Sequence, residues 1–126
     1  MLRLRMQNVG CPLVLVSLLL CDIAKADVIK CSFTEPFMAT AYDTSLNRMT
    51  VTYDVEMRQR IFDRVSMRQI SPGTFEFRNA SGQLLQRVKR SCRGSDGMSD
   101  RKYPYEAELI IEKLHGGCTS TGLTRC

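Results

Sequence analysis

Apolar and polar residues alternate along most of the chain after residue 27. The clearest example runs from Met49 to Met57, where apolar residues occupy the odd positions and polar or charged residues the even ones. A period of two places each set of side chains on its own face of a β-strand, whereas a helix would scatter the apolar side chains around its surface. The pattern therefore predicts a half-buried strand over 49–57.

Six further segments show the same pattern more briefly, at 28–33, 37–42, 61–68, 74–78, 83–89 and 105–113. The four residues from Asn79 to Gly82 are rich in turn formers, so the strands on either side of them are expected to form a hairpin. The segment 55–67 also fits a helical pattern. About seven short strands in roughly 100 residues predict an all-β fold, a single small antiparallel β-barrel or sandwich.

The first 26 residues have the composition of a secretory signal peptide. Arg3 and Arg5 precede an apolar run over 12–20, and Ala24 and Ala26 occupy the positions that a signal peptidase reads. We therefore expect cleavage after Ala26, a single exported domain over 27–126, and no transmembrane segment in the mature chain. Lipid attachment at Cys21 is not favoured, because leucines stand where a lipidation site needs small residues.

The mature chain keeps four cysteines, and an even number in an exported domain predicts two disulfide bonds. Three pairings are possible. We prefer Cys92–Cys118, which would tie a long loop to an expected turn at Gly116 and Gly117, and Cys31–Cys126, which would pin both chain ends. No Cys-x-x-Cys pair is present and His115 is the sole histidine, so the spacing of a zinc site is lacking and no metal or cofactor is expected.

Charge narrows the possible partners. Loss of the signal peptide removes three basic residues and one acidic residue, which lowers the net charge from +5 to about +3. The basic residues are scattered, so no nucleic-acid interface is expected. The closest approach to a basic run is Arg58, Arg60, Arg64 and Arg68, which we interpret as a solvated strand face.

Turn formers, charges and a cysteine gather between Cys92 and Tyr105. Asp96-Gly97 is a turn dipeptide, and Pro104 limits regular strand pairing to Tyr105 and beyond. Many such polar loops only hydrogen-bond themselves. The loop is nevertheless the surface we select as a candidate binding site, with Glu35 from a separate turn. The predicted binding residues are Glu35, Asp96, Ser99, Asp100, Arg101 and Tyr103.

Two motifs resemble those of a family of small uncharacterised bacterial envelope proteins, many of them lipoproteins. The first is Thr-Glu-Pro-Phe at 34–37, and the second is Ser-Asp-Gly-Met-Ser-Asp-Arg at 95–101, followed by Tyr103-Pro104 and later by Gly117-Cys118. The chain departs from the family pattern at Met38, where the family has tryptophan, and at the extra Arg93-Gly94 after Cys92. The resemblance implies an envelope location and carries no agreed activity.

The candidate chemistry of the loop is sparse. A serine hydrolase site would combine Ser95 or Ser99 with His115 and Asp100, but a lone histidine in an expected turn is weak support. Glu35 with Asp96 or Asp100 would serve for acid and base chemistry, although Glu35 and Arg101 are equally suited to a structural ion pair. Calcium binding by Asp96 and Asp100 lacks the dense oxygen pattern that this cation requires.

The sequence therefore predicts a non-catalytic, periplasmic or secreted binding module with its interaction surface around Glu35 and the loop from Ser95 to Arg101, and we expect a monomer. Its expected partner is an envelope protein or a glycan. The alternative is a hydrolase of unknown type that uses the serine and aspartate residues of the loop. Within the loop, we expect Asp96 to be structural, and Asp100 and Arg101 to face an external partner.

Overall fold

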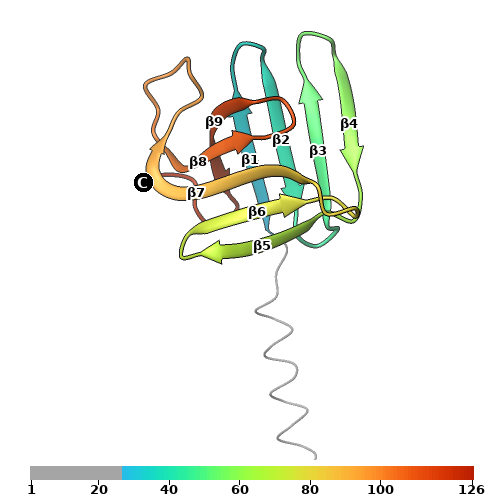
Figure 1. Ribbon diagram of the computed structural model, residues 1–126. Helices are drawn as coiled ribbons and strands as arrows, with labels where there is room; N and C mark the ends of the chain where they lie inside the picture. The colour runs from blue at the N-terminus through green and yellow to red at the C-terminus, as the bar shows by residue number, and fades with distance from the viewer. Residues whose placement is uncertain (1–26) are drawn as a thin grey trace, which may run out of the picture.

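A computed structural model describes residues 27–126, which form nine antiparallel β-strands in a single sheet (Figure 1). The predicted signal peptide and Cys21 lie outside the described residues. The strands are β1 (Val28–Phe33), β2 (Met38–Asp43), β3 (Arg48–Tyr53), β4 (Arg58–Phe62), β5 (Ser66–Ser71), β6 (Thr74–Arg78), β7 (Leu84–Gly94), β8 (Tyr103–Leu109) and β9 (Leu114–Ser120). Their order across the sheet is β4-β3-β2-β1-β9-β8-β7-β6-β5.

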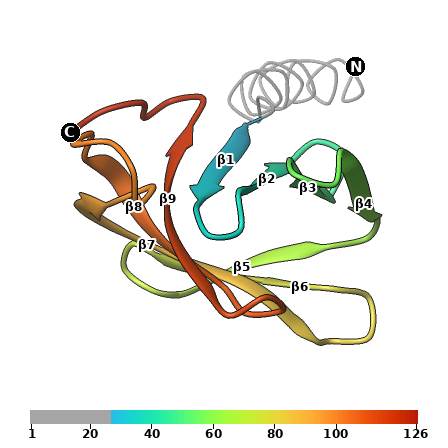
Figure 2. The ribbon, with the colours of Figure 1, turned by 90° about the horizontal axis from the view of Figure 1, so that it is seen from above.

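The sheet curves into a half-barrel (Figure 2). Its two edges are β4 and β5, which follow each other in the chain but are not paired with each other. This confirms the all-β antiparallel prediction, with nine strands in place of about seven. No helix occurs within 27–126, so the helical alternative for 55–67 is wrong.

Two predicted strands are interrupted. The alternation over 49–57 continues into a turn at 54–57, where Met57 adopts a φ of 50° and its backbone N–H donates to the carbonyl of Asp54. The predicted strand over 61–68 is divided by residues 63–65, where Arg64 has a φ of 54°. Residues in the left-handed backbone conformation interrupt regular strand pairing. Because neither Met57 nor Arg64 is glycine, these interruptions cannot be predicted from the sequence.

The predicted turn at Gly116 and Gly117 is instead part of β9, which is paired on both sides. A Cβ on Gly116 would lie 2.2 Å from the carbonyl oxygen of Ser32 and 2.6 Å from the ring of Phe33. A Cβ on Gly117 would lie 2.6 Å from the ring of Tyr103. The two glycines therefore allow an aromatic ring to cover the strand at each residue, and close packing explains their presence.

Strand β8 also begins earlier than expected, because Tyr103 pairs with Gly94 ahead of Pro104. The β7–β8 register shifts between Arg90 and Gly94, and no ladder partner pairs with Pro104. A proline is tolerated at such a bulge because its missing N–H is not needed there.

The core lies on the concave side of the sheet. Tyr42 on β2 and Phe77 on β6 are not on neighbouring strands, yet their rings meet edge to face with centroids 4.8 Å apart. The core is apolar apart from a few buried polar groups, among which the Thr40 hydroxyl donates a 2.8 Å hydrogen bond to Oε1 of the fully buried Gln86. Contact across the open barrel joins the two halves of the curved sheet in one core cluster.

Two disulfides are present, but they join different partners from those preferred from the sequence. Cys31 bonds to Cys118, its direct neighbour across the β1–β9 ladder, and Cys92 bonds to Cys126. The preferred pairs, Cys92–Cys118 and Cys31–Cys126, are therefore wrong. The error follows from assigning Gly116 and Gly117 to a turn, because only a strand there places Cys118 opposite Cys31.

Within residues 27–126, no helix is long and apolar enough to cross a membrane.

Candidate functional site

The loop over 95–102 folds back from the end of β7 toward the turn between β1 and β2 (Figure 1). The Thr34 hydroxyl donates a 2.8 Å hydrogen bond to the backbone carbonyl of Asp96. Gly97 packs beside this contact, and a Cβ there would lie 2.2 Å from Oγ1 of Thr34. The two motif segments at 34–37 and 95–101 thus meet in space, although more than 60 positions separate Thr34 from Asp96.

Asp96 holds the loop together. Its Oδ1 accepts the backbone N–H groups of Met98 at 2.9 Å and Ser99 at 2.8 Å, and its Oδ2 accepts the hydroxyls of Ser99 at 2.9 Å and Tyr103 at 3.1 Å. The amide donors of Ser99 and Met98, followed by these hydroxyls, lower the pKa of Asp96 to about 2. With both carboxylate oxygens occupied, Asp96 has the structural role expected of it.

Tyr103 connects the loop to the sheet. Its ring is buried against Gly117 outside the main core cluster, and its hydroxyl reaches Asp96. Burial, and then the hydrogen bond to the Asp96 carboxylate, raise the pKa of Tyr103. The predicted binding residue Tyr103 therefore supports the loop and offers little surface to a ligand.

Arg101 covers Tyr103 from outside. Its guanidinium lies 4.6 Å from the centroid of the Tyr103 ring, and Nη2 donates a 3.2 Å hydrogen bond to the carbonyl of Thr124. The ion pair considered between Glu35 and Arg101 is not formed within the described chain. Arg101 instead connects the loop to the C-terminal tail, which the Cys92–Cys126 disulfide also holds.

Glu35 and Asp100 differ from the other predicted site residues. Both are exposed, and neither side chain makes a hydrogen bond or ion pair with another residue of 27–126. Glu35 also adopts a φ of 55°, which directs the turn between β1 and β2. These two carboxylates are available to a partner, whereas Ser99 is engaged by Asp96.

A groove of about 290 Å³ lies between the loop and strands β8 and β9. Its lining includes three charged or titratable side chains that are exposed: Arg93, Glu106 and His115. Ser95, Gly97, Ala107 and Gly116 complete it. Sequence reasoning missed Arg93 and Glu106 as site residues, since the irregular pairing of β7 with β8 is what brings Arg93 and Glu106 to one groove.

The proposed serine triad is only partly assembled. Ser95 and His115 line the same groove, but Asp100 does not. The Ser95 hydroxyl oxygen accepts the N–H of Gly97 at 3.0 Å, and no hydrogen bond joins Ser95 to His115 within the described residues. The acidic residue opposite His115 in the ladder is Glu108, whose carboxylate pairs with Arg87 at 3.2 Å.

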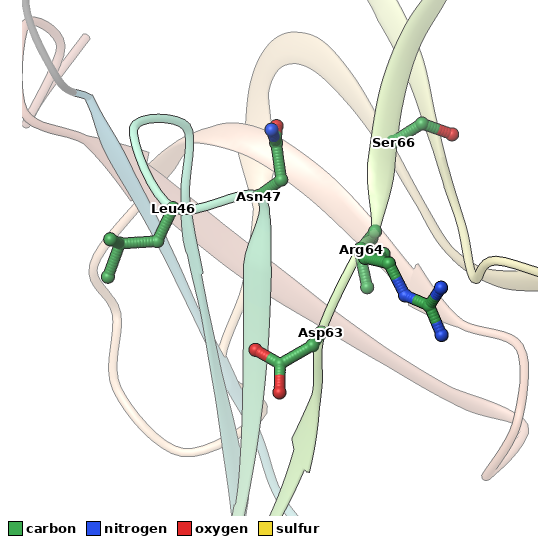
Figure 3. Close-up of a pocket in the computed structure, with 6 residues that line it drawn as sticks. Leu46, Asn47, Asp63, Arg64 and Ser66 are labelled. Atoms are coloured by element: carbon green, nitrogen blue, oxygen red, sulfur yellow. The ribbon is translucent and has the colours of Figure 1, made fainter.

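A second hollow, of about 410 Å³, lies between the β2–β3 turn and the linker over 63–65 (Figure 3). Leu46 points away from Arg64, and Asp63 forms a 2.7 Å ion pair with Arg48. The backbone of Val65 is fixed by Asn47 and Tyr42. No predicted site residue lines this hollow, and its contacts serve to anchor the linker.

The residues of 27–126 contain no group of three or more His, Cys, Asp or Glu side chains placed to hold a metal ion. In comparisons with known proteins, no family model, no curated protein and no solved structure matches this chain.

Proposed function

We propose that the protein is an exported, non-catalytic binding module for an envelope protein or glycan. Its interaction surface would be the loop face, which we define as Glu35, Asp100 and Arg101 with the groove residues Arg93, Ser95, Glu106 and His115. The observation that carries the proposal is a difference between side chains of one loop. Asp96 and Ser99 hydrogen-bond each other, whereas the Asp100 side chain is exposed and makes no hydrogen bond or ion pair within the described chain.

Export is supported by the signal-peptide pattern of the first 26 residues and by two disulfides, which persist in oxidising compartments. Between the periplasm and the external medium, the family resemblance favours the periplasm, because that family is found in the cell envelope.

The charge distribution suits a polar partner. The loop face combines the carboxylates of Glu35, Asp100 and Glu106 with the guanidinium groups of Arg93 and Arg101. Such a surface offers hydrogen-bond donors and acceptors side by side, which is what a hydroxyl-rich glycan or a polar protein surface would use. Exposed charges of this kind set specificity and association rate more than total affinity.

Retention assays with mature protein over 27–126 test the proposal. The protein would be sedimented with purified peptidoglycan sacculi and, separately, photo-crosslinked in a solubilised envelope-protein extract. Replacing Asp100 and Arg101 together by alanine should reduce retention in one of these assays by about tenfold. The matched control replaces Lys30 and Asp54, which are exposed residues of the same charges on β1 and in the β3–β4 turn, and should leave retention unchanged. Equal loss in both variants, or in neither, would contradict the loop face.

The second candidate, a hydrolase, is favoured only by the presence of Ser95 and His115 in one groove. It predicts turnover of an ester, amide or glycoside substrate that Ser95→Ala and His115→Ala each abolish. A binding module turns over none of these substrates, in the wild type or in either variant, because it carries out no proton transfer.

A further inference from the structure

The half-barrel leaves two strand edges without a partner. β4 pairs only with β3, and β5 only with β6, so the outer backbone N–H and C=O groups of both strands have no ladder partner in the described sheet (Figure 2). Four of the five residues of β4 and all six residues of β5 are exposed. Such edges are templates for pairing with another extended chain.

Apolar surface gathers near these edges. Six of the eight exposed large apolar residues lie between positions 46 and 70, including Ile61 on β4, which is 55% exposed, and Ile70 on β5, which is 48% exposed. An edge protected only against aggregation would be expected to carry polar residues at these positions. The exposed isoleucines therefore favour an interaction surface.

The arginines of β4 point to the concave side of the sheet. Arg58 and Arg60 lie opposite Tyr53 and Val51, which are buried on that side. The Arg58 guanidinium is 4.1 Å from the centroid of the Tyr53 ring, and that of Arg60 is 4.6 Å from the centroid of Phe62. Stacking on aromatic rings holds both guanidinium groups in place at the mouth of the half-barrel.

These positive charges are only partly compensated. Arg58 pairs with Glu56, but Arg60, Arg64 and Arg68 make no ion pair within residues 27–126. Arg60 on β4 and Arg64 in the linker have no carboxylate partner among the described residues, whereas Arg68 on β5 lies opposite Glu76 in the β5–β6 ladder, whose carboxylate pairs with Arg78 and Arg87. This excess favours a partner that brings carboxylates to the edge.

The same charges disfavour a second copy of this chain. In a fully overlapped antiparallel pairing of two β4 strands, Arg60 would lie directly opposite Arg60, because it is the central residue of Arg58–Phe62. Like charges directly opposite each other destabilise a strand pair. The charges on β4 thus disfavour pairing with the β4 strand of a second copy and favour pairing with an acidic extended segment.

We propose that β4 captures an extended acidic peptide segment as an added strand. Residues directly opposite each other in a sheet point to the same face, so carboxylates opposite Arg58 and Arg60 would meet the guanidinium groups, and a residue opposite Ile61 would cover it. The fitting segment carries Glu or Asp at two alternate positions, with an apolar residue beside them. This surface is separate from the loop face.

The test uses mature 27–126 labelled with ¹⁵N and the synthetic peptide acetyl-Thr-Leu-Val-Glu-Thr-Glu-Thr-amide. Amide shifts should change along β4 and saturate on titration. The same peptide with lysine for both glutamates should bind at least tenfold more weakly. A peptide N-methylated on the edge that faces β4 should lose binding, because the added ladder bonds cannot form.

Two protein variants sharpen the result. Arg60→Gln should weaken binding of the glutamate peptide by about threefold to tenfold, and Arg60→Glu should shift the preference toward the lysine peptide. The matched control Arg93→Gln removes an arginine of the loop face and should leave the affinity unchanged. This control also separates failure of the edge proposal from failure of the binding module proposed above.

Three outcomes would overturn the proposal. One is equal affinity for the glutamate and lysine peptides in wild-type protein, and another is a set of shifts confined to β8, β9 and the loop. The third is concentration-dependent dimerisation through β4 without peptide, which would assign the edge to a second copy of the chain.

Discussion

The Tyr103 hydroxyl donates a 3.1 Å hydrogen bond to Oδ2 of Asp96, seven residues earlier in the chain. Because the Tyr103 ring is buried against Gly117, this bond attaches the loop to the sheet through a side chain that cannot easily move. The same carboxylate accepts the backbone N–H groups of Met98 and Ser99. Asp96 therefore transmits the position of a rigid strand to the whole loop.

Asp96→Ala should destabilise the protein by about 2 kcal/mol, because it removes a carboxylate that satisfies two backbone and two hydroxyl donors. For a domain of this size the melting temperature should fall by roughly 10 °C. Asp100→Ala is the control, and should change the free energy of unfolding by less than about 0.5 kcal/mol because its side chain is exposed. Equal melting temperatures for the two variants would contradict the structural role of Asp96.

Stability should fall as the solution becomes acidic. Asp96 has a pKa of about 2 in the folded protein, below its value of about 3.9 in an unfolded chain. The resulting stabilisation is complete above the unfolded pKa and is lost as the pH falls through the folded value, from about pH 4 to pH 2. Glu76, beside Arg87 and Arg78, and Asp43, bonded by Ser45, also have lowered pKa values and act in the same direction.

Denaturant unfolding of wild type and Asp96→Asn between pH 2 and pH 6 measures this effect. The variant should show a shallower loss of stability on acidification, since one group with a lowered pKa is gone. A parallel pair of curves would show that Asp96 does not contribute to the pH dependence.

The alternation of apolar and polar residues located most of the strands, but it did not show where a strand ends at a turn. The pattern predicted β1 and β6 with the bounds that the structure has. It continued past Tyr53 because Val55 and Met57 are apolar, although they are 73% and 90% exposed in a turn. Apolar residues at exposed turn positions continue the alternation of a strand although they are not buried. The end of β3 could therefore not be located from the sequence.

Tertiary packing explains the larger errors. Gly116 and Gly117 are typical of a turn by composition, and only the rings of Phe33 and Tyr103 reveal why a strand needs them. The disulfide pairing depends on this strand, because Cys118 reaches Cys31 through the β1–β9 register.

The candidate site was predictable only in part. A polar loop over 95–101 follows from its turn residues, and the structural role expected for Asp96 agrees with its contacts. Arg93 on β7 and Glu106 on β8 join the site through the irregular β7–β8 pairing, which no spacing along the chain encodes.

Gly117→Ala should destabilise the protein by about 1–3 kcal/mol. The new methyl group would lie 2.6–2.8 Å from the ring and Cβ of Tyr103, so the ring and the attached loop must shift. Gly122→Ala is the matched control, because no atom lies within 4 Å of the new methyl group there. Chemical denaturation compares the two variants, and a Gly117→Ala protein as stable as the control would contradict the close packing of Tyr103.

The two disulfides should differ in their response to a mild reductant. Cys31 and Cys118 are 1% and 0% exposed, whereas Cys126 is exposed and Cys92 is partly so. Thiol–disulfide exchange requires access of the attacking thiolate to a sulfur atom, so Cys92–Cys126 should open first in the folded protein.

Alkylation during a dithiothreitol titration, followed by peptide mapping, measures the order of opening and the pairing together. In the chain-entropy model the loop-closure stabilisation is about 4 kcal/mol for the 34-residue separation of Cys92–Cys126 and about 5 kcal/mol for the 87-residue separation of Cys31–Cys118. The Cys92→Ser/Cys126→Ser double variant should therefore remain folded, because the buried bond still joins β1 to β9. Labelling of Cys31 and Cys118 before Cys92 and Cys126 would contradict the difference in access, and recovery of a peptide that joins Cys92 to Cys118 would contradict the pairing itself.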